Sequence, residues 1–184
     1  ALRDLLIAKD FISLSMLRQQ MDQTASQSAS VGAEIIARAW TTSMFKDALL
    51  KNPKKALLES GYDVSGMPDL CIVENQPDIH NVVVCTLCSC YPRYMLGPPP
   101  DWYKSAAFRS RIVHEPRDVL LEFGLELNET AKIRVYDSTA DIRYMVMPMR
   151  PAGTAHMSAD ELKPLITRDT MIGVTLPVPK VTES

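Results

Sequence analysis

Three of the four cysteines of this 184-residue sequence, Cys85, Cys88 and Cys90, fall within six residues. Alternate side chains of a strand point to opposite faces, so these thiolates can meet at one metal ion only if the segment curls into a loop. A disulfide scaffold would spread its cysteines along the chain instead. The spacing therefore predicts a metal site, and we call residues 85–90 the claw.

The chemistry of the claw depends on its main chain as well as on its sulfurs. A tight loop brings the amides of Ser89 and Cys90 inside the ring of thiolates, and amides that lose their protons become strong-field nitrogen ligands. Three sulfurs and two nitrogens would leave one position open on a polarising trivalent ion, where water or a substrate is activated.

The spacing alone leaves two other metals open. Structural zinc needs a fourth ligand, which His80 would supply in a Cys3His set. An iron–sulfur cluster usually has a fourth thiolate, which this loop lacks. Cys71 stands apart in an apolar stretch and is expected to be a buried, inert thiol.

The bulk composition limits the classes of protein to consider. The sequence is 46% hydrophobic and 23% charged, which suits a folded protein with a real core. Its formal net charge of −2 argues against nucleic acid or an anionic membrane as a partner. Charged residues interrupt the apolar N-terminus, so no signal peptide or membrane span is predicted. We expect a cytoplasmic protein.

The elements that must position the claw follow from periodicity, capping residues and β-branched runs. Helices are predicted over residues 33–40, 43–50, 53–61, 102–113 and 116–123, with a last one from residue 158. Strands are predicted at residues 70–73, 81–84, 132–136 and 142–147. The second strand runs directly into the claw. This order of elements indicates an α+β domain with helices layered on a sheet.

Residues 1–30 are predicted to form a helical arm and its linker. Residues 2 to about 21 carry the apolar stripe of a helix, and residues 22–30 are small, polar and aperiodic. A striped helix outside the core usually lies on another surface, for which a partner subunit is one candidate. The domain that holds the claw is expected to span residues 31–184.

The sequence around the claw resembles the alpha subunits of cobalt-type nitrile hydratases. Residues 81–92 are similar to their metal-binding motif, in which Cys-Thr-Leu-Cys-Ser-Cys is highly specific. Further similarity lies at residues 99–105, 109–120, 143–154 and 167–174, so the resemblance covers roughly residues 31–176. It implies a layered α-β-β-α metal-binding domain with an N-terminal helical arm.

The resemblance also implies a chemistry for the claw. Cys85, Cys88 and Cys90 would supply sulfur, and Ser89 and Cys90 backbone nitrogen, to one low-spin Co(III) per chain. Thr86 marks the cobalt type, so iron is the less expected ion. Cys88 would be oxidised to a sulfinate and Cys90 to a sulfenate. The catalytic residues would be Cys88, Ser89 and Cys90, and the reaction the addition of water to a nitrile to give the amide.

The partners follow from the same resemblance. A beta-type subunit would complete the active site, because two of its arginines hold the oxidised sulfurs in this family. A metallochaperone or activator would insert the cobalt, and the substrate would be a small-molecule nitrile. No nucleic acid and no membrane are expected.

Two residues after the claw depart from the usual family pattern. Where nitrile hydratases have tryptophan after Tyr91-Pro92, this sequence has Arg93, and Tyr94 replaces a proline. An arginine here resembles the gamma subunit of thiocyanate hydrolase, a relative that uses the same cobalt claw on an anion. We expect Arg93 and Tyr94 to line the substrate pocket, where a guanidinium suits an anion or a polar substrate. Hydrolysis of thiocyanate to carbonyl sulfide and ammonia is the alternative reaction.

Two non-enzymatic alternatives stay open at this point. A zinc-stabilised interaction domain would use the claw as a structural site. Segments resembling residues 36–61 also occur in leader peptides of ribosomally made natural products, which lack an intact claw. Metal analysis separates both from a catalytic subunit, because neither predicts a cobalt ion with oxidised thiols.

Overall fold

The computed structural model describes residues 29–179. The helix predicted over residues 2–21 and nearly all of its linker lie outside the described residues, so the arm stays a prediction. Within residues 29–179, no helix has the length and apolar character needed to cross a membrane.

Three consecutive helices open the described part of the chain, as the sequence predicts. They are α3 (Ser30–Thr41), α4 (Ser43–Lys51) and α5 (Pro53–Glu59). The side chain of Asn52 accepts a hydrogen bond from the Lys55 amide at 3.1 Å and caps α5, with Pro53 at the first helical position. Helix α3 buries its apolar stripe, with Ile35 and Ile36 fully covered.

All four predicted strands are confirmed, with ends that shift by one or two residues. They are β1 (Asp69–Glu74), β2 (Ile79–Val84), β3 (Lys132–Asp137) and β4 (Ile142–Met147). They form two parallel pairs, β1 with β4 and β2 with β3. The register places Val84 opposite Asp137, so the claw begins beside the end of β3.

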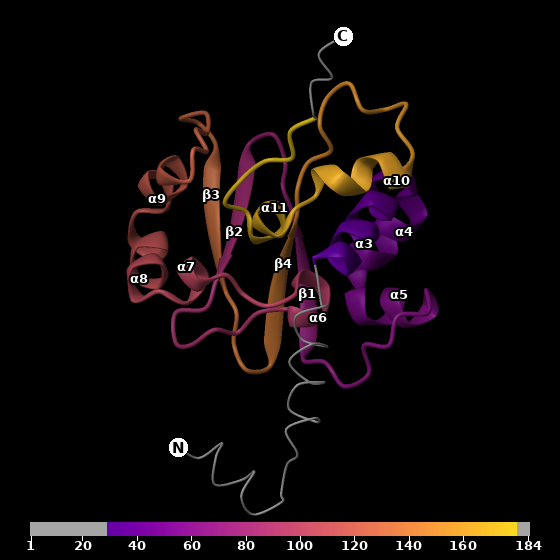
Figure 1. The fold of residues 1–184 in the computed structure, drawn as a ribbon, viewed down its shortest axis with the longest axis horizontal. Helices are drawn as coiled ribbons and strands as arrows, with labels where there is room; N and C mark the ends of the chain where they lie inside the picture. Colours follow the sequence, from indigo (N-terminus) through magenta and orange to yellow (C-terminus); the bar gives the residue numbers. More distant parts are fainter. Residues whose placement is uncertain (1–28, 180–184) are drawn as a thin grey trace, which may run out of the picture.

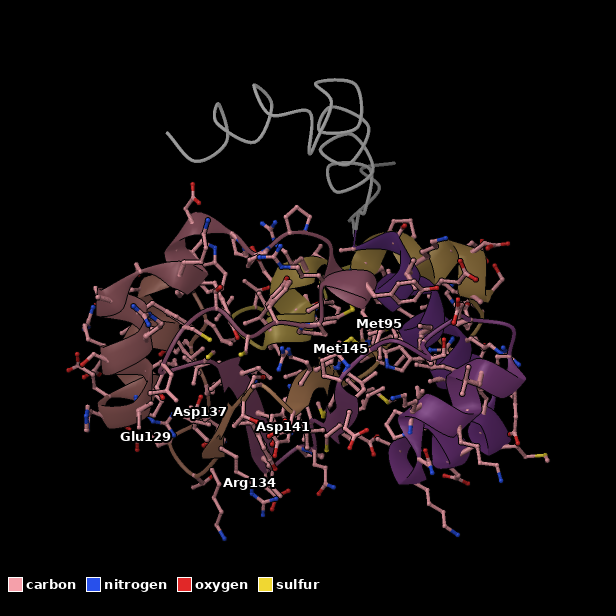
Figure 2. The ribbon with its side chains drawn as sticks, turned by 90° about the horizontal axis from the view of Figure 1, so that it is seen from below. Met95, Glu129, Arg134, Asp137, Asp141 and Met145 are labelled. Carbon is pink, nitrogen blue, oxygen red and sulfur yellow. The ribbon has the colours of Figure 1, made fainter. Side chains whose placement is uncertain are left out.

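The layers follow the predicted α-β-β-α order. Helices α8 (Ala106–His114) and α9 (Pro116–Glu122) lie on the outer side of β3, and α3 to α5 lie on the outer side of β1 (Figure 1). Strands β2 and β4 are neighbours in the middle of the molecule. Figure 2 shows Met95 and Met145 in the interior between these layers and Arg134 at the surface. Both methionines are fully buried.

The helix predicted over residues 102–113 is wrong, because the chain breaks at Ser105 into α7 (Asp101–Lys104) and α8. Ser105 is extended, with φ −66° and ψ 141°. Its hydroxyl donates to the Trp102 carbonyl at 2.8 Å and accepts from the Phe108 amide at 3.1 Å. Serine competes for main-chain hydrogen bonds in this way, ending one helix and capping the next.

Several short helices complete the fold. The predicted capping box at Ser158 and Glu161 opens α10 (Ala159–Leu162). Helix α6 (Arg93–Leu96), the 3-10 helix η1 (Lys163–Leu165) and α11 (Arg168–Ile172) were not predicted. Each has too few residues to show a helical period.

Candidate metal centre

The three cysteine sulfurs of the claw converge on one point. All lie within 4.8 Å of one another, and they are the one cluster of at least three potential ligands among residues 29–179. The Sγ atoms of Cys85 and Cys88 are 3.4 Å apart, and those of Cys88 and Cys90 are 3.2 Å apart. All three cysteines are free thiols. This sulfur-rich donor set fits a soft or borderline transition metal.

The backbone amides of the claw also turn toward its sulfurs. The Cys88 amide donates to the Cys85 sulfur at 3.3 Å. Hydrogen bonds from the side chains of Cys90 and Cys85, and then from the amides of Cys90 and Ser89, lower the pKa of the Cys88 thiol to about 7. Desolvation, followed by the hydrogen bond with Cys88, raises the pKa of Cys90 to about 12. Cysteine binds a metal as the thiolate, so a metal ion that enters the claw would displace the protons of these thiols.

His80 does not join the cysteines as a fourth ligand. Its Nε2 donates to the Gly173 carbonyl at 2.7 Å, and its Nδ1 faces the Asn75 side-chain nitrogen at 3.3 Å. The ring is 4% exposed. Both nitrogens are therefore occupied inside the fold, and the structure gives no support to the Cys3His zinc site that the spacing left open.

Three side chains outside the claw hold its main chain. Asp137, at the end of β3, accepts from the Thr86 amide at 2.9 Å and from the Thr86 hydroxyl at 2.5 Å. Arg109 donates to the Thr86 carbonyl at 3.2 Å. The hydroxyl of Tyr103 donates to the Cys90 carbonyl at 3.0 Å. None of these three residues was predicted to take part in the site. The signal for Asp137 was its place at the end of a strand, since carboxyl ends of paired parallel strands meet at one edge.

A cavity of about 430 Å³ opens beside the claw. Residues 88–94 line one side, and the turn at residues 66–68 and Arg143 line the rest. Arg93 and Tyr94 both belong to this lining. The guanidinium of Arg143 opposes the rise in the pKa of Cys90, although its effect is the smallest of those that act on this thiol. The cavity is therefore lined both by cysteines of the claw and by two cationic side chains, Arg93 and Arg143.

The hydroxyl of Tyr91 is buried beside the same cavity without a hydrogen-bond partner among residues 29–179. Burial raises the pKa of this phenol, so it is neutral. A buried hydroxyl without a partner departs from the usual pairing of buried polar groups.

The family model of the nitrile hydratase alpha chain matches residues 1–175. The low-molecular weight cobalt-containing nitrile hydratase subunit alpha of Rhodococcus rhodochrous is 43% identical over 180 residues, covering 96% of this chain and 86% of that one. The thiocyanate hydrolase subunit gamma of Thiobacillus thioparus is 39% identical over 193 residues, covering 99% of this chain and 79% of that one.

The fold has the same relatives. A double mutant of the Fe-type nitrile hydratase from Comamonas testosteroni Ni1 superposes with a TM-score of 0.90 at 38% identity, covering 100% of this chain and 94% of that chain. The family model matches nearly the whole chain, and that match includes the cysteine cluster after β2. The chain belongs to the nitrile hydratase alpha chain family.

Proposed function

We propose that this chain is the catalytic, metal-binding subunit of a cobalt-type nitrile hydratase, which adds water to a nitrile to give the amide. The observation that carries the proposal is the convergence of three sulfurs within 4.8 Å beside a cavity of about 430 Å³. Thr86 in the claw and the 43% identity to a cobalt-containing relative favour cobalt over iron.

The residues of the claw would hold one Co(III) ion. Cys85, Cys88 and Cys90 would give sulfur, and Ser89 and Cys90 would give main-chain nitrogen, with Cys88 as a sulfinate and Cys90 as a sulfenate. The Cys88 amide already donates to the Cys85 sulfur at 3.3 Å, so main-chain nitrogen turns toward the sulfurs of this loop, which supports this donor set. When bound, the ion supplies Lewis acidity at the edge of the cavity.

Cys88, Ser89 and Cys90 are the proposed catalytic residues, and all three line the cavity. The sulfenate oxygen of Cys90 is the candidate nucleophile toward the nitrile carbon. Arg93 and Tyr94 would orient the polar end of the substrate, because both belong to the same lining. Asp137 fixes the start of the claw through both main chain and side chain of Thr86.

We infer that a second chain covers the claw and keeps bulk solvent away from it. Leu87 at its tip is 87% exposed and Cys88 is exposed, whereas electrostatic catalysis depends on a dry site. A beta-type subunit is the proposed cover and the source of the arginines for the oxidised sulfurs. An activator that inserts cobalt is the second proposed partner. Residues 1–30 would serve as the arm and residues 31–184 as the catalytic domain.

Metal analysis with intact-mass measurement tests the proposal. We expect one cobalt per chain in the assembled protein, two extra oxygens on Cys88, one on Cys90, and the amide as product from a nitrile. Stoichiometric iron with the same oxidised thiols would show that the metal is iron rather than cobalt, and the proposed reaction would stand. Stoichiometric zinc with unoxidised thiols would end the catalytic proposal.

Arg93 supports thiocyanate hydrolysis as a second candidate function. A guanidinium in the cavity lining attracts an anion more strongly than a neutral nitrile. Offering both substrates to the same preparation, and detecting carbonyl sulfide or amide, decides between them. If thiocyanate is the substrate, Arg93→Gln should raise its KM while leaving the cobalt content unchanged.

A further inference from the structure

The two ends of the claw are held by side chains from two consecutive helices, α7 and α8. Arg109 of α8 reaches the Thr86 carbonyl at 3.2 Å, and Tyr103 of α7 reaches the Cys90 carbonyl at 3.0 Å. The peptide groups that carry the amides of Ser89 and Cys90 lie between these two carbonyls along the chain. The two helices therefore hold the main chain of the claw on both sides of its proposed nitrogen ligands.

The break at Ser105 accounts for how both side chains reach the same loop. In one continuous helix, residues six positions apart would point roughly 120° away from each other. The extended Ser105 reorients α8 relative to α7, and Arg109 also donates its Nε to the Ser105 carbonyl at 3.4 Å. The break and the two contacts thus belong to one local arrangement.

We infer that Tyr103 and Arg109 are positioning residues of the metal centre, which keep the carbonyls of Cys90 and Thr86 turned away from the sulfurs. Both carbonyls are partly buried, and a partly buried carbonyl that loses its donor is left unpaired at a cost in free energy, which favours its rotation toward another donor. Such a rotation would move the neighbouring peptide planes and turn the amides of Ser89 and Cys90 off the metal. The inference rests on the proposed function, because it assigns those amides to the ion.

The hydroxyl of Tyr103 can be tested apart from the packing of its ring. Tyr103 is fully buried, with its ring centroid 5.0 Å from that of Tyr91 and 5.9 Å from that of Phe108. Phenylalanine keeps these ring contacts and removes only the donor. Arg109 is half-buried, so Arg109→Gln removes the charge and the long donor at a site that tolerates change.

The experiment uses the full chain loaded with cobalt and compares wild type, Tyr103→Phe, Arg109→Gln and Tyr62→Phe. The last variant is the matched control, because it also removes a single tyrosine hydroxyl, one that donates to Glu34 of α3 at 2.7 Å rather than to a carbonyl of the claw. The readouts are the rate of cobalt loss to a chelator, the sulfur-to-cobalt absorption band, the oxygen count on the cysteines, and Tm.

We expect cobalt loss about 10- to 100-fold faster in Tyr103→Phe and Arg109→Gln, the usual size for outer-shell partners of a metal ligand. We also expect an altered absorption band and incomplete oxidation of Cys90. Tyr62→Phe should match wild type. Arg109→Lys should recover part of the loss, because it restores a cationic donor.

Unchanged cobalt release and an unchanged absorption band in both variants, with only a lower Tm, would show a merely structural role and overturn the inference. If Tyr103→Phe does not fold, Arg109→Gln alone decides. The metal content and cysteine oxidation of the wild-type chain test the proposed function separately. If wild type holds another metal, the release of that metal is compared in the same variants, so one idea can fail without the other.

Discussion

Asp137 illustrates at the scale of one residue how the fold shapes the claw. Its two carboxylate oxygens accept from the amide and the hydroxyl of Thr86, and a carboxylate is the acceptor that suits both donors at once. We predict that Asp137→Asn speeds cobalt loss to a chelator by about 10-fold or more, because one oxygen becomes a donor that faces the Thr86 hydroxyl.

Asp63→Asn is the matched control for that measurement. Asp63 accepts from the amide and hydroxyl of Ser65 in an exposed turn, the same pair of contacts away from the claw. Its cobalt release should equal that of wild type. Equal release from the Asp137 and Asp63 variants would show that Asp137 does not support the metal site.

His80 makes the fold sensitive to acid. Desolvation lowers its pKa below the ordinary 6.5, although the hydrogen bond to Gly173 opposes this shift. Asn75 cannot turn its oxygen toward Nδ1, because that oxygen already accepts from the amide and the side chain of Asn81. The folded state therefore binds a proton at His80 less readily than the unfolded state does.

The sign of the pH dependence follows from this. Above about pH 6.5, His80 is neutral in both states and the free energy of unfolding should keep its full value. As the pH drops toward the lower folded-state pKa, the free energy of unfolding should fall by up to about 1.4 kcal/mol per pH unit. His80→Gln should flatten this decline in urea titrations of the metal-free chain between about pH 7 and pH 5. His156→Gln, on an exposed loop, should keep it. Parallel curves for wild type and His80→Gln would refute the role of His80.

Single residues differed in how far the sequence alone could assign them. Cys85, Cys88 and Cys90 could be assigned because their close spacing in the sequence is typical of metal ligands. The structure brings all three sulfurs together. Tyr103 and Arg109 could not be assigned, because their partners are carbonyl oxygens that every residue carries. His80 was ambiguous for the opposite reason. A histidine near cysteines suits a metal, and only the fold shows its nitrogens bonded to Gly173 and Asn75.

At the scale of elements, the end of α11 shows how closely a helix can approach a strand. Gly173 has φ +93°, and a Cβ placed there would lie 2.1 Å from the Asn81 carbonyl oxygen in β2. We predict that Gly173→Ala lowers the free energy of unfolding by more than about 4 kcal/mol, because backbone rather than a flexible side chain must move.

Gly124→Ala separates the strain of the backbone from the steric contact. Gly124 has φ +79°, but a Cβ there meets nothing within 4 Å. This variant should lose only about 1–2 kcal/mol, the cost of a left-handed conformation for an L-residue. Urea denaturation of both variants gives the comparison. Similar losses would mean that β2 yields to the added methyl group.

Elements were predictable where their own residues determine them. The strands at residues 81–84 and 142–147 carry β-branched or apolar runs, and α10 opens with a capping box. The parallel pairing of β1 with β4 was not predictable, since it joins residues such as Asp69 and Ile142, 73 positions apart, through contacts that no local pattern encodes. The break at Ser105 was missed because no glycine or proline marks it, while one hydroxyl satisfies two main-chain groups.

At the scale of the whole molecule, the layered arrangement of strands and helices positions the claw. The paired ends of β2 and β3 bring Cys85 and Asp137 to the same edge, with α7 and α8 on one side (Figure 1). The hydrophobic core of the described residues runs from Ala33 to Val174. The elements that hold the claw therefore belong to the packed body that the described residues form.

Removing residues 1–28 tests that division of the chain. Because the core of the described residues starts at Ala33, we predict a Tm within about 2 °C of the full chain, as for a change outside the core. The shortened chain should also keep its affinity for cobalt, since Asp137, Arg109 and Tyr103 remain. If the arm lies on the beta-type subunit, co-purification of the two chains should weaken. A fall in Tm of more than about 10 °C would instead show that the arm packs in the core of this chain. Unchanged co-purification would show that the beta-type subunit binds mainly to the surface around the claw rather than to the arm.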